Sequence, residues 1–94
     1  MSYKLRISED AEKEWTSLDK PIREQFKKKL KERMDAPRVE KDRLSGMADC
    51  YKIKLRSAGF RLVYRVYDDE IEILIIAVGK RERNRVYKAA IKRL

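Results

Sequence analysis

The sequence is short, strongly basic and free of histidine: it has 94 residues, 25 Lys and Arg against 16 Asp and Glu, a net charge of +9, and a single Cys. This composition leaves room for one domain, residues 1–94, and it excludes histidine-based triads, histidine-ligated metals and intrachain disulfides. Because a protein this basic attracts polyanions, we expect a nucleic-acid or ribosomal partner.

The expected compartment follows from the cysteine count and the hydropathy. Cys50 has no partner cysteine and is predicted to be inert packing, which fits a reducing compartment. No apolar stretch of signal-peptide length opens the sequence, and the roughly 18 apolar residues of a membrane span run together nowhere. We therefore expect a cytoplasmic chain without membrane contact.

The first residues predict an edge strand followed by a helix. Residues 3–7 alternate apolar and basic side chains, so the inward-facing residues should be Tyr3, Leu5 and Ile7. Ser8 is a suitable N-cap, and Glu9 and Asp10 favour the first helical turn. The apolar face of this helix is formed by Ala11, Trp15 and Leu18, with Trp15 expected in the core.

A second helix is predicted to follow at once. Pro21 is tolerated in a first turn, and apolar residues then recur every four positions, at Ile22, Phe26, Leu30 and Met34. The helix should end at residues 35–37, because a residue that precedes a proline avoids the helical region. The two helices are expected to pair as a hairpin, and residues 38–49 to form a loop.

The second half predicts three strands and a closing helix. The strands are expected at Cys50–Arg56, Phe60–Tyr67 and Ile71–Val78, and the last is apolar enough to be the central one. Helical spacing of Tyr87, Ala90, Ile91 and Leu94 predicts a final amphipathic helix over residues 83–94. The expected fold class is α+β: a small, twisted, mostly antiparallel sheet with the helical hairpin on one face and the C-terminal helix near the other.

One face of this sheet should be lined with positive charge. Strand alternation sends Tyr51, Ile53 and Leu55 to the core and therefore sends Lys52, Lys54 and Arg56 to the opposite side. The same reasoning applied to the next strand puts Arg61 and Arg65 beside them. Because like charges that face each other on a sheet are destabilising, a polyanion is expected to neutralise this face.

Cationic side chains of this kind suit one reaction, the attack of an RNA 2′-hydroxyl on its own phosphate. Preorganised cations stabilise the charge that builds on the phosphoryl oxygens. Crowding of Lys52 beside Lys54 and Arg61 should lower the pKa of the lysines, so that either lysine could accept a proton. Neither metal-ligand spacing nor a nucleotide-binding loop is present in the sequence, so we expect no metal and no cofactor.

Four stretches give the sequence a family resemblance over essentially its whole length. They are residues 23–30 (Arg-Glu-Gln-Phe-Lys-Lys-Lys-Leu), residues 46–57 (Gly-Met-Ala-Asp-Cys-Tyr-Lys-Ile-Lys-Leu-Arg-Ser), residues 61–64 and residues 78–83. In these the chain resembles the RelE family of bacterial and archaeal toxins, which are ribosome-dependent mRNA interferases. The resemblance implies cleavage of mRNA in the ribosomal A site through a 2′,3′-cyclic phosphate, and inhibition by a RelB-like antitoxin.

The family pattern also implies the site residues. Its functional positions fall on Lys52, Lys54, Arg61, Arg81 and Tyr87, and each residue type is present. The resemblance assigns the phosphate cradle to Lys54 and Arg61, and base-side or orienting roles to Lys52 and Tyr87. Leaving-group assistance falls to Arg81, which is better suited to stabilising charge because arginine does not give up its proton. The sequence departs from the pattern at Ser45, where close relatives often have arginine.

Further cations are expected to contact RNA or the ribosome. They are Lys27, Lys28 and Lys29 on the second helix, and Arg56, Arg65, Lys80 and Arg83 around the sheet. Each group of cations has a simpler interpretation, because charged runs usually form a solvated face. Tyr87 also has one, since its spacing is that of a packing residue in the last helix. Two alternative functions stay open: a noncatalytic ribosome- or RNA-binding protein, and a gyrase-inhibiting toxin of the same fold.

Overall fold

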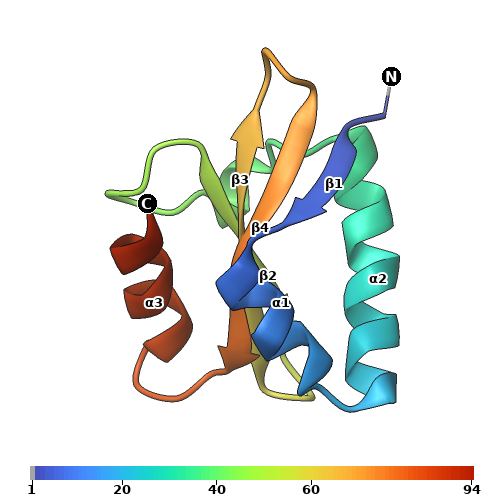
Figure 1. Ribbon diagram of the computed structural model, residues 1–94, viewed down its shortest axis with the longest axis vertical. Helices are drawn as coiled ribbons and strands as arrows, with labels where there is room; N and C mark the ends of the chain where they lie inside the picture. The colour runs from blue at the N-terminus through green and yellow to red at the C-terminus, as the bar shows by residue number, and fades with distance from the viewer. Residues whose placement is uncertain (1) are drawn as a thin grey trace.

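The computed structural model describes residues 2–94 and consists of one four-stranded sheet with helices on both faces (Figure 1). In chain order the elements are β1 (Lys4–Ile7), α1 (Glu9–Thr16), α2 (Lys20–Asp35), a short 3-10 helix η1 (Glu40–Asp42), β2 (Cys50–Leu55), β3 (Phe60–Tyr67), β4 (Glu72–Lys80) and α3 (Arg85–Arg93). The strand order is β1-β4-β3-β2; β1 pairs parallel with β4, and the other pairs are antiparallel. The predicted α+β class and mostly antiparallel sheet are confirmed, with β4 in the interior of the sheet.

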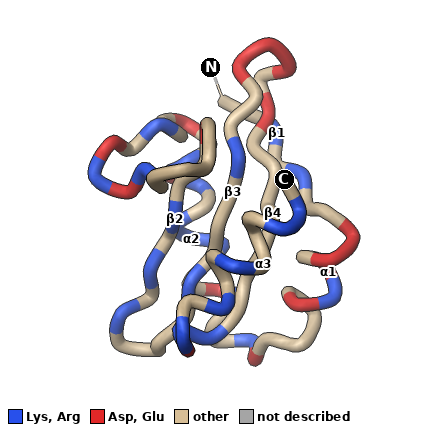
Figure 2. The backbone as a smooth tube through the Cα atoms, turned by 90° about the vertical axis from the view of Figure 1, so that its left-hand side faces the viewer, with Lys and Arg blue, Asp and Glu red and all other residues tan. Residues whose placement is uncertain are grey.

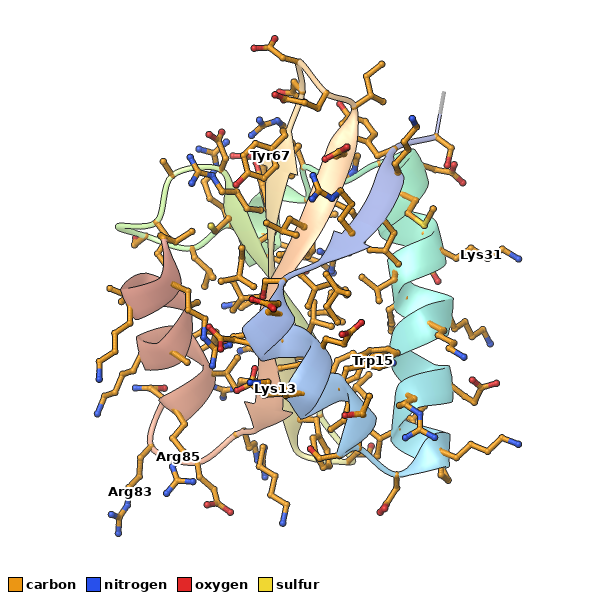
Figure 3. The ribbon with its side chains drawn as sticks, viewed as in Figure 1. Lys13, Trp15, Lys31, Tyr67, Arg83 and Arg85 are labelled. Atoms are coloured by element: carbon orange, nitrogen blue, oxygen red, sulfur yellow. The ribbon has the colours of Figure 1, made fainter. Side chains whose placement is uncertain are left out.

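The larger core lies between the sheet and the helical pair α1 and α2. Phe26 and Leu30 of α2 are buried against the inward side chains of β2 and β3, as the four-residue repeat predicted. Trp15 packs on Phe26 with ring centroids 6.2 Å apart, and Figure 3 shows it between α1 and α2. This contact links the two helices, and it confirms Trp15 as a packing residue.

A smaller core lies on the opposite face, under α3. Val86 and Ala90 are its buried helical residues, and they pack with Val63, Ile76 and the other residues of this smaller core. Ile76 is the extra residue of a β-bulge, since Val63 pairs with Ala77 and Tyr64 with Ile75. Within residues 2–94, no helix is long and apolar enough to cross a membrane.

The starts of the first two helices follow the expected capping chemistry. The hydroxyl of Ser8 accepts a hydrogen bond of 3.2 Å from the backbone N–H of Ala11. Pro21 lies in the first turn of α2, where its missing N–H costs no helical hydrogen bond.

Three predicted element boundaries were wrong, because turns take residues that the side-chain pattern assigned to regular structure. Arg56 lies beyond β2, which ends at Leu55. Ile71 has a φ of 52° and belongs to the turn before β4, which continues to Lys80. Arg83 also has a positive φ, 48°, so it lies outside α3, which begins at Arg85.

The edge strand β1 was only partly described by the alternation. Tyr3 and Ile7 pack against the larger core, and Leu5 pairs with the buried Ile73 on the same face, as expected, but it stays 41% exposed. The reason is that β1 lies at the sheet edge, where it has a partner strand on one side only.

The charge of the sheet differs between its two ends. The turn that joins β3 to β4 carries Asp68, Asp69 and Glu70. At the other end β2 finishes and β3 begins, and Lys54, Arg56 and Arg61 lie there. Figure 2 shows this separation, with red at the β3–β4 turn and blue along the lower part of β2.

Candidate active site

A row of side chains across three strands brings the first predicted site residues together. Lys54 pairs directly with Arg61, and Arg61 pairs with Gly79 on β4. Their strand neighbours Ile53 and Leu62 lie in the larger core, so the cations lie on the face that α3 covers. Lys52 precedes Lys54 by two residues on the same strand, hence on the same face. The structure therefore agrees with the predicted cationic face.

Lys54 and Arg61 line a cleft of about 350 Å³ at the end of the sheet. Its lining residues are Lys54, Leu55, Arg56, Phe60, Arg61 and Arg81. The positive groups come from β2 and the residue after it, from β3, and from the segment between β4 and α3. Segments distant in sequence thus place several cations around one space that can hold a phosphate group.

Arg81 reaches this cleft because its backbone is tied to the β2–β3 turn. Its N–H donates a hydrogen bond of 2.9 Å to the carbonyl of Gly59. Gly59 has a φ of +71°, and a Cβ placed on it would lie 3.6 Å from Nε of Arg81. The glycine therefore allows the left-handed turn, and the Arg81 side chain passes at ordinary contact distance beside it.

Tyr87 joins the site through Arg61. The guanidinium carbon of Arg61 lies 5.2 Å from the centre of the Tyr87 ring, a cation–π contact between β3 and α3. The Tyr87 hydroxyl is buried, and it has no hydrogen-bond partner among residues 2–94. Burial raises the pKa of Tyr87, although the charge of Arg61 acts in the opposite direction. The side chain is thus a protonated hydroxyl at neutral pH with its hydrogen-bonding capacity unused.

The cationic neighbours change the acidity of Lys54. Its pKa is lowered from the ordinary value of 10.5, chiefly by the charge of Lys52, then by burial, and then by Arg61 and Arg56. Like charges disfavour the protonated ammonium, so a neutral amine is easier to form here than on an isolated lysine. This is the direction that the sequence predicted for Lys54.

A partly buried ion-pair network supports β2, the strand of the two lysines, from the side of α2. Arg33 of α2 donates hydrogen bonds to the carbonyl of Lys52 at 3.2 Å and to the hydroxyl of Tyr64 at 2.8 Å. It also pairs with Asp42 at 2.6 Å. The sequence reasoning missed this role of Arg33. A signal was present, since position 33 lies three residues after Leu30 on the apolar side of the helix.

The other predicted RNA contacts are scattered. Lys27 and Lys28 are exposed on α2, and Lys27 pairs with Glu24; Lys29 lines a groove beside β2 that also includes Lys52, Lys54 and Arg56. Arg65 lies towards the other end of β3, with its guanidinium 5.1 Å from the Tyr67 ring centre.

Two further candidates lie past the end of β4. Lys80 opens onto a groove between α1 and α3, and Arg83 extends from the linker below α3 (Figure 3). The structure therefore brings Lys54, Arg56, Arg61, Arg81 and Tyr87 together, with Lys52 alongside, and leaves Lys27, Lys28, Arg65, Lys80 and Arg83 outside the cleft.

Neither the thiol nor the carboxylates add a further reactive group to this cleft. Cys50 is fully buried, and burial raises the pKa of its thiol, as suits the packing role predicted for it. Over the described part of the chain, no three Cys, Asp or Glu side chains lie close enough to share a metal ion.

Comparison with known proteins places this chain among the toxins of toxin–antitoxin systems. The model of the family described as the ParE toxin of the type II toxin–antitoxin system parDE matches residues 5–85. The mRNA interferase toxin RelE of Escherichia coli strain K12 is 54% identical over 94 residues, which is 100% of this chain and 99% of the relative.

Solved structures agree with the sequence match. The free E. coli RelE (R81A/R83A) mutant has a TM-score of 0.92 and 52% identity, and covers 100% of this chain and 99% of its own. The toxin of the intact E. coli RelBE toxin–antitoxin complex has a TM-score of 0.84 and 54% identity, over 87% of this chain and 100% of its own. The chain therefore belongs to the RelE/ParE toxin family and, within it, to the RelE mRNA interferases.

Proposed function

We propose that this protein is a toxin domain that cleaves mRNA in the A site of cytoplasmic ribosomes, without a metal ion, and so stops translation. The observation that carries the proposal is the cleft in which Lys54, Arg61 and Arg81 meet beside the unpaired hydroxyl of Tyr87. Cations fixed around a phosphate-sized space stabilise the charge of a phosphoryl transition state. The name of the E. coli relative, an mRNA interferase toxin, describes the same activity.

The proposed reaction is an internal phosphoryl transfer. The 2′-oxygen of the nucleotide attacks the adjacent phosphorus, and the bond from phosphorus to the 5′-oxygen breaks, which leaves a 2′,3′-cyclic phosphate and a 5′-hydroxyl. Lys54, with its lowered pKa, is suited to take the 2′-hydroxyl proton, and Lys52 promotes this by its charge. Arg61 and Arg81 hold the phosphoryl oxygens and the departing 5′-oxygen, which takes a proton from water while Lys54 releases its extra proton to the solvent. Tyr87 orients Arg61 through its ring, and its hydroxyl, buried in the free protein, is available to donate a hydrogen bond to a phosphoryl oxygen when the substrate binds.

We further propose that the ribosome supplies the substrate geometry and that a RelB-like antitoxin blocks the site. Few aromatic rings are available for stacking bases, so the toxin alone does not orient a free strand. The E. coli RelBE structure shows a toxin of this family in a complex with its antitoxin. On this chain the exposed Ile91 and Leu94 of the last turn, 59% and 47% accessible, offer apolar surface to such a partner near Tyr87.

A cleavage assay with and without ribosomes tests this function. The purified protein is expected to leave free RNA intact, to cut mRNA on programmed ribosomes, and to leave 2′,3′-cyclic phosphate ends; added RelB-like antitoxin should abolish the cut. Equal cutting of both substrates would contradict ribosome dependence. Ribosome binding without cleavage would favour the noncatalytic alternative. Inhibition of gyrase, with neither ribosome binding nor cleavage, would favour a gyrase-inhibiting toxin of the same fold.

Lys52 is expected to control the proton affinity of Lys54. Replacing Lys52→Met removes the largest cause of the lowered pKa, so the pKa of Lys54 should rise toward 10.5. At a fixed pH below that pKa less neutral amine is then present, and the rising limb of the pH–rate profile should move to higher pH. Lysine side-chain NMR of the free protein measures the shift, with the signal assigned by its loss in Lys54→Met. The variant Lys13→Met, on α1, is the control; an unchanged pKa in Lys52→Met would exclude the coupling.

A further inference from the structure

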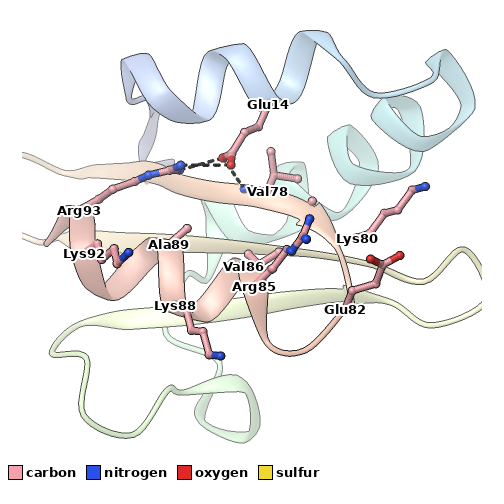
Figure 4. A pocket seen from close by; sticks show the side chains of 11 residues that line it. Glu14, Val78, Lys80, Glu82, Arg85, Val86, Lys88, Ala89, Lys92 and Arg93 are labelled. Atoms are coloured by element: carbon pink, nitrogen blue, oxygen red, sulfur yellow. Dashed lines mark hydrogen bonds and ion pairs between the residues drawn. The ribbon is translucent and has the colours of Figure 1, made fainter.

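The edge of β4 that lies beyond β1 is closed by ion pairs between the first and last helices, in which Arg93 of α3 contacts Glu14 at 2.8 Å and Asp10 at 3.7 Å on α1. β1 covers β4 only as far as Ile75, which pairs with Ile7. Past that point, the backbone N–H of Val78 donates to Oε1 of Glu14 on α1 at 3.2 Å. Arg93 on α3 donates to the same carboxylate at 2.8 and 3.1 Å and to the carbonyl of Ile76 at 2.8 Å. Figure 4 shows Glu14 reaching across to Arg93 beside Val78.

Together with the contact of Arg93 to Asp10, this contact holds the last turn of α3. The first turn of α3 lies close to the sheet, because a Cβ on Gly79 would be 3.5 Å from Val86. Near the last turn, Ile91 is 59% exposed and Ala90 is the last buried residue. The Glu14 and Arg93 side chains are 33% and 23% exposed, so their two-pronged, charge-assisted contact is partly shielded from water.

Tyr87 depends on the same docking. It lies on α3 between the Val86 anchor and Arg93, and only the docked helix puts its ring against Arg61 at 5.2 Å. Helices move as rigid units, so release of the last turn changes the position of Tyr87. Neither Glu14 nor Arg93 lines the cleft of Lys54 and Arg81.

We propose that Glu14 and Arg93 are positioning residues that keep α3 docked and thereby keep Tyr87 beside Arg61. The catalytic part of this inference rests on the proposed function, because it needs a role for Tyr87 in cleavage. The docking part does not depend on it. Glu14 acts at a distance from the cleft, from α1, which contributes no residue to the cleft lining.

The test compares Glu14→Gln and Arg93→Met with a matched surface pair. Glu14→Gln keeps an acceptor for Val78 and removes the charge, and Arg93→Met keeps most of the side-chain volume. In the free protein, amide hydrogen exchange over residues 86–93 should rise about 10-fold or more, with the exchange of β3 unchanged. The NMR signal of the Tyr87 ring, assigned with Tyr87→Phe, should shift as its contact with Arg61 is lost. The double variant should add little to either single change.

The control is Arg6→Met, which breaks an exposed ion pair between β1 and β4 at 3.2 Å without touching α3. On ribosomes, kcat of Glu14→Gln and of Arg93→Met should be about 10-fold lower than that of the wild type, with KM near the wild-type value. Arg93→Lys should recover part of the loss. Unchanged hydrogen exchange in α3 would overturn the inference. So would faster exchange in Glu14→Gln and Arg93→Met together with cleavage at the wild-type rate, if Tyr87→Phe cleaves more slowly than the wild type. If the wild type and Tyr87→Phe cleave alike, the role of Tyr87 fails, and the exchange data still decide the docking.

Discussion

Replacing Arg81 with methionine is expected to slow cleavage of mRNA on ribosomes by about 10² to 10³ while ribosome binding stays near the wild-type level. Arg81 extends into the cleft from the segment after β4 and makes no ion pair with the carboxylates of residues 2–94. Its charge is therefore available to the reacting phosphate. A single-turnover assay on programmed ribosomes measures the rate, and sedimentation with ribosomes measures binding.

The fold should survive this change. The chain superposes with a TM-score of 0.92 on an E. coli RelE that carries both R81A and R83A, so this architecture does not need those arginines. Lys13→Met removes the same charge from an exposed position on α1 and should cut at the normal rate. If Arg81→Met instead loses affinity in step with cleavage, and its binding becomes less dependent on salt, the residue grips phosphate and takes no part in the chemistry.

Arg33→Met is expected to lower the free energy of unfolding by about 2–4 kcal/mol, a large share of the stability of a domain this size. The substitution leaves Asp42 without its partner in a site where the two side chains are only 12% and 18% exposed. It also removes the donors to Tyr64 and to the Lys52 carbonyl on the outer edge of β2. Cleavage should fall too, because β2 carries both lysines of the site.

Urea unfolding followed by the fluorescence of Trp15, the single tryptophan, measures this loss. Lys27→Met is the matched control, since it breaks an ion pair on the same helix whose side chains are 63% and 57% exposed. That change should cost less than about 0.5 kcal/mol. A loss below about 1 kcal/mol for Arg33→Met would show that water replaces the network with little penalty.

Local patterns were enough to predict the sheet and its charged face. The apolar run before Gly79 predicted an interior strand, because only a strand covered on both faces has so few polar positions. The alternation around Lys52 and Lys54 predicted their common face, because a strand has a fixed period of two. Arg61 followed from the same rule on the next strand, and its pairing with Lys54 confirms that they are neighbours.

Features that depend on distant contacts could not be predicted in this way. Glu14 and Arg93 are 79 positions apart, and nothing in the sequence near either residue indicates the other. The positive φ of Ile71 is unfavourable for a β-branched residue and is imposed by the turn between two paired strands. Arg65 lies on the same face of the sheet as Arg61, but four residues further along β3 and beside Tyr67, so it is outside the cleft. Alternation predicts the face of a residue and not its distance from the site.

The acidic β3–β4 turn and the cationic cleft lie at opposite ends of one sheet, and this gives the molecule an electrical direction. If the ribosome is the partner, as we propose, its phosphate-dense surface repels Asp69 and Glu70 and attracts the far end of the sheet, so the field turns an approaching molecule before any contact forms. Encounters should then begin with the cleft leading, at a rate that falls as salt shortens the range of the field.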